Sequence, residues 1–102
     1  MTTPLYGLLE RDLKHIEDAV KSMPEIEKLI LFGSRAKGTY KLGSDIDLAI
    51  KGVAVTYETV VRLSRILNEE KPIPYFVDIV DYNSISEQRL IDHIDRVGIE
   101  LK

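Results

Sequence analysis

Apolar residues recur at intervals of three and four positions near the beginning of the chain. They are Leu5, Leu8, Leu9, Leu13, Ile16, Val20 and Met23. This spacing places them on one face of a helix, because an α-helix completes a turn in about 3.6 residues. The pattern therefore predicts an amphipathic helix that ends before Pro24, since proline cannot continue a helix.

Two segments further along have the pattern of strands. Residues 28–32 form a short apolar run that Gly33 stops, which is typical of a buried strand. Residues 45–50 alternate strictly between two faces, which predicts a strand that is buried on one side. One face carries Asp45, Asp47 and Ala49, and the other carries Ile46, Leu48 and Ile50. The intervening residues 33–44 are rich in glycine and serine and predict a loop with room for one helical turn.

The second half of the chain predicts another helix and a third strand. Thr56 can cap a helix. The residues expected on its inner face are Val60, Leu63 and Ile66 or Leu67. Residues 75–80 follow two prolines and have the β-branched and aromatic composition of a strand.

The last predicted element is a helix that begins with a capping box, Ser84 with Glu87, and runs to about Val97, where Gly98 closes it. The short connection between the first two strands favours antiparallel pairing, and the helical crossover to the third permits parallel pairing. We therefore expect one α/β (α+β) domain over residues 1–102, with a mixed sheet of about three strands covered by helices.

Composition narrows the classes of function. The 102 residues include 14 basic and 17 acidic side chains, a net charge of -3, and no cysteine. The lack of cysteine excludes disulfides and thiolate metal sites, and the negative charge argues against strong nonspecific binding of nucleic acid. No signal peptide is recognisable, and the longest apolar run, residues 29–32, is too short to span a membrane, so we expect a cytoplasmic protein. Its small size makes a partner or a second copy a reasonable expectation.

The alternating strand places two carboxylates on the same face. Asp45 and Asp47 lie roughly 6.6 Å apart along the chain, so both can reach ions held roughly 3.5–4 Å apart in a two-metal site. Ligands that are all hard oxygens favour Mg²⁺. An isolated Asp-x-Asp is more often part of a solvated sheet face.

The two histidines do not add to such a metal site. His15 and His93 lack a partner at metal-ligand spacing, which favours surface or packing roles.

A glycine and a hydroxyl follow the first strand. Gly33 allows the backbone to approach a ligand closely, and N–H groups in such a turn, with the Ser34 hydroxyl, can hold a phosphate. Arg35 and Lys37 add positive charge for a phosphate, although a solvated surface explains either equally well, and plain loops also contain glycine and serine. A Walker A loop is excluded, because Gly38 is followed directly by Thr39.

The two motifs together have the spacing of a known family. Gly33-Ser34, ten intervening residues and then Asp45-Ile-Asp47 resemble the Gly-Ser…Asp-x-Asp signature of the DNA polymerase beta-like nucleotidyltransferases. The runs 31–38 and 44–48 are similar to the minimal nucleotidyltransferase branch, which contains little beyond the catalytic core. The resemblance covers essentially the whole chain and implies a polymerase beta palm-like fold.

The resemblance also implies a role for each motif residue. Gly33 and Ser34 would hold nucleotide phosphates, while Asp45 and Asp47 would bind magnesium. The family has a third carboxylate on a later strand, and Asp78, within 77–80, matches that context as a metal ligand that helps to activate the incoming hydroxyl. Asp81 competes for this role, but alternation places it on the opposite face, where it is expected to cap the following turn.

In the branch that this chain resembles, the catalytic core is commonly paired with a helical HEPN-type toxin. The resemblance therefore implies an antitoxin that uses two Mg²⁺ ions to transfer AMP from ATP to a tyrosine of that toxin. The assembly would be a homodimer or a hetero-oligomer. One alternative is a nucleotidyltransferase that acts on a small-molecule hydroxyl together with another subunit. Another is a non-catalytic module that binds nucleotide or masks a partner.

Overall fold

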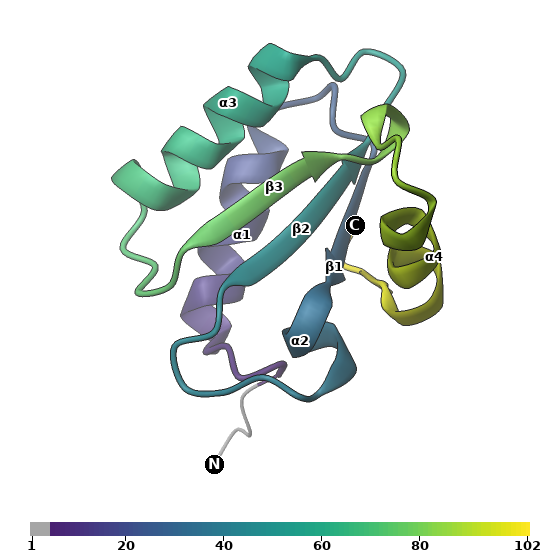
Figure 1. Ribbon diagram of the computed structural model, residues 1–102. Helices are drawn as coiled ribbons and strands as arrows, with labels where there is room; N and C mark the ends of the chain where they lie inside the picture. The colour runs from purple at the N-terminus through teal and green to yellow at the C-terminus, as the bar shows by residue number, and fades with distance from the viewer. Residues whose placement is uncertain (1–4) are drawn as a thin grey trace.

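The elements of the computed structural model, which describes residues 5–102, alternate between helices and strands (Figure 1). They are α1 (Glu10–Lys21), β1 (Lys28–Phe32), α2 (Gly33–Lys37), β2 (Ile46–Lys51), α3 (Tyr57–Arg65), β3 (Val77–Asp81), α4 (Gln88–Val97) and β4 (Ile99–Glu100). A π-helical turn, η1 (Ile66–Glu70), continues α3, and a 3-10 turn, η2 (Tyr82–Ser84), follows β3. Within these described residues, no helix has the length and apolar character needed to cross a membrane.

The strands form one mixed sheet in the order β3-β2-β1-β4. β1 and β2 pair antiparallel, and β2 and β3 pair parallel, so the expected pairings and the mixed sheet are confirmed. The expectation of about three strands missed β4, which pairs antiparallel with β1 at the other edge. A strand of only two residues, Ile99–Glu100, is too short to show an alternating pattern in the sequence.

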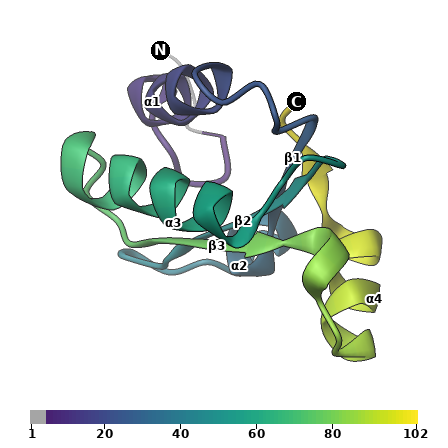
Figure 2. The same cartoon turned by 90° about the horizontal axis from the view of Figure 1, so that it is seen from above.

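Helices cover the two faces of the sheet unequally. In Figure 2, α1 and α3 lie on one side of the sheet and α4 lies on the other. The α1/α3 side holds the larger core, which includes Leu29, Leu31, Ile46, Leu48, Ile50, Val77 and Ile79 from the strands. The smaller core on the α4 side contains Ile30, Phe32, Ala49 and Ile94. The predicted faces of the 45–50 strand are therefore confirmed, with the apolar face toward the larger core.

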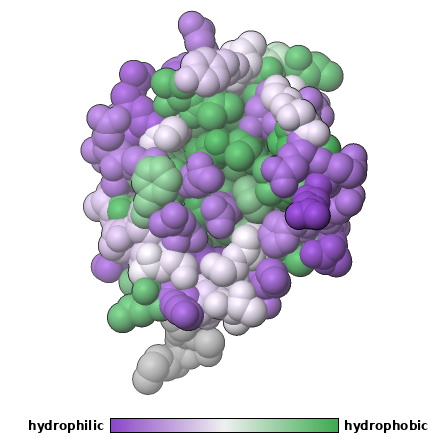
Figure 3. Space-filling model, in the orientation of Figure 1, coloured by the Kyte–Doolittle hydropathy of each residue, from purple (hydrophilic) through white to green (hydrophobic). Residues whose placement is uncertain are grey.

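The register of the sheet brings two acidic residues side by side. Asp47 of β2 pairs with Phe32 of β1 on one side and with Asp78 of β3 on the other. Because paired residues on adjacent strands point to the same face, the two carboxylates share the face on which α4 packs. α4 contacts the neighbouring row, where Ala49 is fully buried, while Asp78 remains exposed. Figure 3 views this side, where an apolar area lies in the middle with hydrophilic residues on and around it.

The first helix is shorter than the apolar periodicity predicted. α1 begins at Glu10, and the preceding residues form a turn closed by a bridge between Leu5 and Leu8. Tyr6 and Gly7 both have positive φ, which interrupts a helix. Leu5 and Leu9, expected on the buried face, are 57% and 45% exposed. The helical spacing continued into this segment, but its glycine allowed the chain to turn instead.

The last helix begins differently from the prediction. α4 starts at Gln88 with Glu87 as its N-cap, and Glu87 makes no side-chain cap. The Ser84 hydroxyl donates a hydrogen bond to Asp81 (2.9 Å), so the proposed capping box is wrong. The preceding strand spans Val77–Asp81 rather than 75–80. The end at Val97 with Gly98 following agrees with the prediction.

The helix predicted from Thr56 is confirmed and has an additional role. The Thr56 side chain accepts a hydrogen bond from the backbone N–H of Thr59, and Leu63 and Leu67 are fully buried. In η1, Asn68 donates to the carbonyl of Val77 (2.9 Å) and accepts from its N–H (2.8 Å). The Asn68 side chain therefore makes the hydrogen bonds that a further strand would make at the free edge of β3. It does so at the residue that precedes Asp78.

Candidate active site

Three predicted carboxylates gather at one end of β2 and β3. Asp47 and Asp78 are direct neighbours across the parallel pair, and Asp45 lies immediately before β2 and is exposed. Asp81 does not join them. Its carboxylate accepts hydrogen bonds from the N–H of Asn83 (3.2 Å) and from Ser84, so it caps η2 as the alternation predicted.

The carboxylates are close enough to influence one another. Burial raises the pKa of Asp47 from 3.8 to about 6, with further contributions from the negative charges of Asp78 and Asp45, while the positive charge of Arg35 acts in the opposite direction. A carboxylate that is partly desolvated and beside two others carries unfavourable negative charge. This is the electrostatic condition that a bound cation relieves.

The predicted glycine turn lies directly against the central carboxylate. Gly33 has a φ of +75°, and a Cβ on it would collide with the Asp47 carboxylate. Only glycine satisfies both conditions, because it has no Cβ and tolerates positive φ. The turn and the carboxylate are therefore in contact, although fourteen positions separate them in the sequence.

The other residues predicted to bind nucleotide occupy different environments. Ser34 is half-buried in α2, and Lys37 is exposed at its end. Arg35 is only 2% exposed, and its guanidinium donates to the carbonyl of Ser44 (2.7 and 3.2 Å) and to the carbonyl of Tyr6 (3.0 Å). It also lies over the Tyr75 ring, 4.3 Å from the centroid. Arg35 thus links the loop before Asp45 to the turn before α1.

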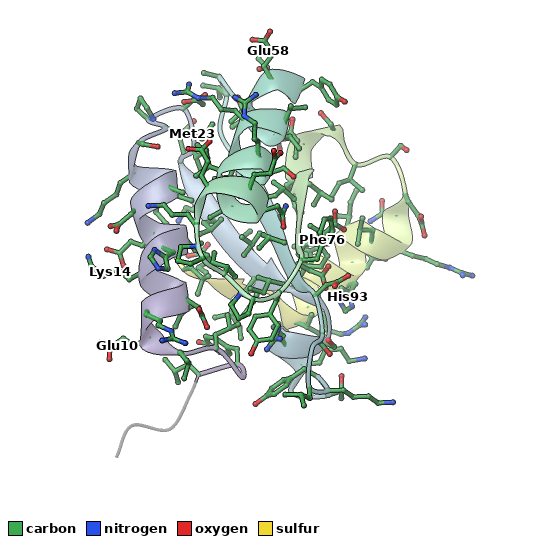
Figure 4. The ribbon with its side chains drawn as sticks, turned by 90° about the vertical axis from the view of Figure 1, so that its left-hand side faces the viewer. Glu10, Lys14, Met23, Glu58, Phe76 and His93 are labelled. Atoms are coloured by element: carbon green, nitrogen blue, oxygen red, sulfur yellow. The ribbon has the colours of Figure 1, made fainter. Side chains whose placement is uncertain are left out.

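His93 is a residue at this site that sequence reasoning missed. Its Nε2 accepts a hydrogen bond from the Gly33 N–H (3.1 Å), and its ring packs edge-on against Phe32 at 6.1 Å between centroids. Figure 4 marks the position of His93. No signal in the sequence points to this contact, because a single histidine within a helix has no local pattern that reveals a partner sixty positions away.

The acidic residues fit a hard divalent cation in ligand type. Carboxylate oxygens are the ligands that Mg²⁺ prefers, and the mutual repulsion around Asp47 favours a bound cation. Within residues 5–102, no three His, Cys, Asp or Glu side chains already stand close enough to hold one ion together. Asp45 and Asp78 are both exposed, which leaves their side chains free to change rotamer.

A mixed sheet with paired carboxylates beside a Gly-Ser turn defines a nucleotidyltransferase-type site. The family model described as polymerase beta, nucleotidyltransferase, matches residues 14–102. The chain therefore belongs to the polymerase beta nucleotidyltransferase family, and the resemblance found in its sequence is confirmed. No curated protein matches the chain in sequence.

Several of the similar solved structures are toxin–antitoxin complexes. A toxin–antitoxin crystal structure with AMP-PNP is 25% identical, with a TM-score of 0.73, and covers 88% of this chain and 72% of that chain. A variant of the toxin–antitoxin MntA–HpeT is 26% identical, with a TM-score of 0.71 and coverages of 92% and 72%. The complex of a tri-AMPylated Shewanella oneidensis HEPN toxin with an MNT antitoxin is 21% identical, with a TM-score of 0.69 and coverages of 91% and 71%, and shows the shared fold.

Proposed function

We propose that this protein is a magnesium-dependent nucleotidyltransferase that transfers AMP from ATP to a tyrosine of a HEPN-type toxin, and that it acts as the antitoxin of the pair in the cytoplasm. The observation that carries the proposal is the row of Asp47 and Asp78 beside Asp45, with Gly33 in contact with Asp47. Residues 1–102 would form the one catalytic domain. Family membership and the similarity to an antitoxin complex that holds AMP-PNP support a nucleotide substrate.

The residues of α2, Gly33–Lys37, have separate roles in the transfer. Gly33 and Ser34 bind the β- and γ-phosphates at the turn, and Lys37, exposed at the end of α2, neutralises phosphate charge. Arg35 acts through the loop that it holds, because its N–H groups already donate to Ser44 and Tyr6. Preorganised groups of this kind contribute mainly by positioning reactants and stabilising charge.

The three carboxylates orient the acceptor and the metal. Asp45, Asp47 and Asp78 would hold two Mg²⁺ ions, which supply positive charge to the phosphates when bound. Asp78, which is exposed beside the half-buried Asp47, orients the acceptor hydroxyl and takes up its proton. The hydroxyl oxygen then bonds to the α-phosphorus of ATP, the bond to the bridging oxygen breaks, and pyrophosphate leaves.

A direct experiment uses two carboxylates of the same strand. The protein is incubated with a purified HEPN-type partner, ATP and Mg²⁺, pyrophosphate release is measured, and the partner is weighed by mass spectrometry. Asp78→Asn should lower transfer by roughly a hundredfold or more, since it removes a group that acts in the transition state. Asp81→Asn, which removes a carboxylate on the opposite face of β3, should retain transfer.

The outcomes separate the competing functions. Pyrophosphate release together with the added mass of AMP on a partner tyrosine supports the proposal. Release without any mass added to the partner favours a small-molecule acceptor. Nucleotide binding with no release by the wild-type protein identifies a non-catalytic module and refutes the enzyme.

A further inference from the structure

We propose that His93 is a positioning residue of the nucleotide site, which holds the Gly33 peptide so that the Gly33-Ser34 turn stands ready for phosphate opposite Asp47. The inference rests on the proposed function, because it assigns a role within the same site. His93 lies on α4, which contains neither the Gly-Ser motif nor the Asp-x-Asp motif.

The position of the Gly33 peptide needs a restraint from outside the turn. Glycine has the greatest backbone freedom of any residue, and Gly33 has a positive φ that only a few residue types adopt readily. Its N–H points toward α4 and donates to His93 Nε2 at 3.1 Å. If that peptide rotated, the backbone that contacts the Asp47 carboxylate would move with it.

His93 is itself held in place. The next residue, Ile94, is 2% exposed and packs in the core between α4 and the sheet with Ile30 and Ala49. The imidazole also packs against Phe32 with its plane at 79° to that ring. Because Nε2 accepts a hydrogen bond, the neutral ring carries its proton on Nδ1. Packing against the sheet thus fixes the position of the His93 ring, and the hydrogen bond that the ring accepts fixes the Gly33 peptide.

The effect of His93 on substrate binding distinguishes positioning from simple packing. His93→Leu fills the same space with an apolar side chain of moderate size and removes the acceptor, whereas the amide oxygen of His93→Gln can accept the same hydrogen bond. His15→Leu, on α1 at the other face of the sheet, is the matched control. The affinity for AMP-PNP with Mg²⁺ is measured by calorimetry, and KM and kcat by pyrophosphate release.

His93→Leu should weaken nucleotide binding by roughly three- to tenfold, the loss expected for one hydrogen bond. The change should appear in KM with kcat largely retained, His93→Gln should restore binding, and His15→Leu should leave it unchanged. In nitrogen-15-labelled protein, a through-bond coupling between the Gly33 nitrogen and His93 Nε2 should be visible and should vanish in the glutamine variant, whose acceptor is oxygen. If His93→Leu does not fold, His93→Asn, whose amide is too short to reach Gly33, replaces it.

Two results would overturn the inference. Nucleotide affinity in His93→Leu equal to that of the wild type would show that the turn needs no such restraint. Equal weakening in the leucine and glutamine variants would show that ring packing matters and the acceptor does not. If the wild-type protein binds no nucleotide, the proposed function itself fails, whereas wild-type binding with an unaffected leucine variant removes only the role of His93.

Discussion

At the scale of single residues, the strongest electrostatic conflict is at Asp47. The folded protein holds a proton on this carboxyl more tightly than the unfolded chain does, since the pKa rises from 3.8 to about 6. Protonated Asp47 therefore contributes to the stability of the folded protein. That contribution is fully present below about pH 4 and is lost as the pH rises through about 6. Ionised groups that destabilise the fold in this way are common at functional sites, because the chemistry there requires the charge.

Asp47→Asn should consequently be more stable than the wild type at pH 7.5 in the absence of divalent ions. We expect a gain on the order of 1 kcal/mol in the free energy of unfolding, after allowing for solvent screening of a partly exposed group. Denaturant unfolding at pH 7.5 and pH 4 measures it. The gain should shrink toward zero at pH 4, and an equal gain at both values would contradict the electrostatic explanation.

The second prediction at this scale concerns Gly33. Gly33→Ala places a Cβ against Asp47 and an L side chain at positive φ, whereas Gly43→Ala, with a φ of +84° and no atom within 4 Å of the added Cβ, adds only the backbone strain. Both should lose roughly 1–2 kcal/mol from strain. Gly33→Ala should lose distinctly more and should also lose nucleotide binding. Equal unfolding free energies in the two variants would show that the turn can move away from Asp47.

At the scale of elements, β3 depends on η1 for its alignment. Asn68→Ala removes both hydrogen bonds to Val77, and we expect a loss of roughly 1–3 kcal/mol in unfolding free energy. Amide hydrogen exchange at Val77 should accelerate in this variant, because the N–H loses its acceptor. The exposed Asn83→Ala, at which only the backbone N–H bonds to Asp81, is the control and should leave both measurements near the wild type.

The same elements show what local sequence patterns can and cannot predict. Alternation along 45–50 correctly assigned Asp47 to the face opposite the main core, because strand periodicity is a local property. The pairing of Asp47 with Asp78 depends on the register between two strands that are distant in the sequence. The family resemblance suggested this pairing, and no local pattern determines it. The capping box failed because Asp81 competes for Ser84, and His93 was overlooked because its partner is distant in the sequence.

At the scale of the whole molecule, substrate and metal should stabilise the fold together. A ligand that binds only the folded state at a hundred times its dissociation constant adds about 2.7 kcal/mol. For a chain of this length, that should raise Tm by roughly 10 °C or more. Thermal unfolding with AMP-PNP and Mg²⁺ measures the shift. It should be much smaller for Asp47→Asn and without Mg²⁺, and a full shift without Mg²⁺ would argue that the carboxylates are not metal ligands.

The unequal covering of the sheet also constrains how an acceptor reaches the site. α1 and α3 cover one face of the sheet, so the proposed acceptor would approach the exposed Asp78 from the other face, on which α4 packs (Figure 2). Phe76, next to β3 and 57% exposed, lies on the same strand face as Asp78 by alternation. A large partner can therefore be accommodated at this face without separating the helices from the sheet.

The buried Arg35 has a practical consequence for anyone who shortens this protein. Its guanidinium is shared between a carbonyl in the turn before α1 and one immediately before Asp45. Trimming the chain back to the start of α1 would leave a cation in the interior with one of its acceptors removed, which is costly. Loss of the Tyr6 carbonyl at the N-terminal end would therefore weaken the anchoring of the loop that leads into Asp45 and β2.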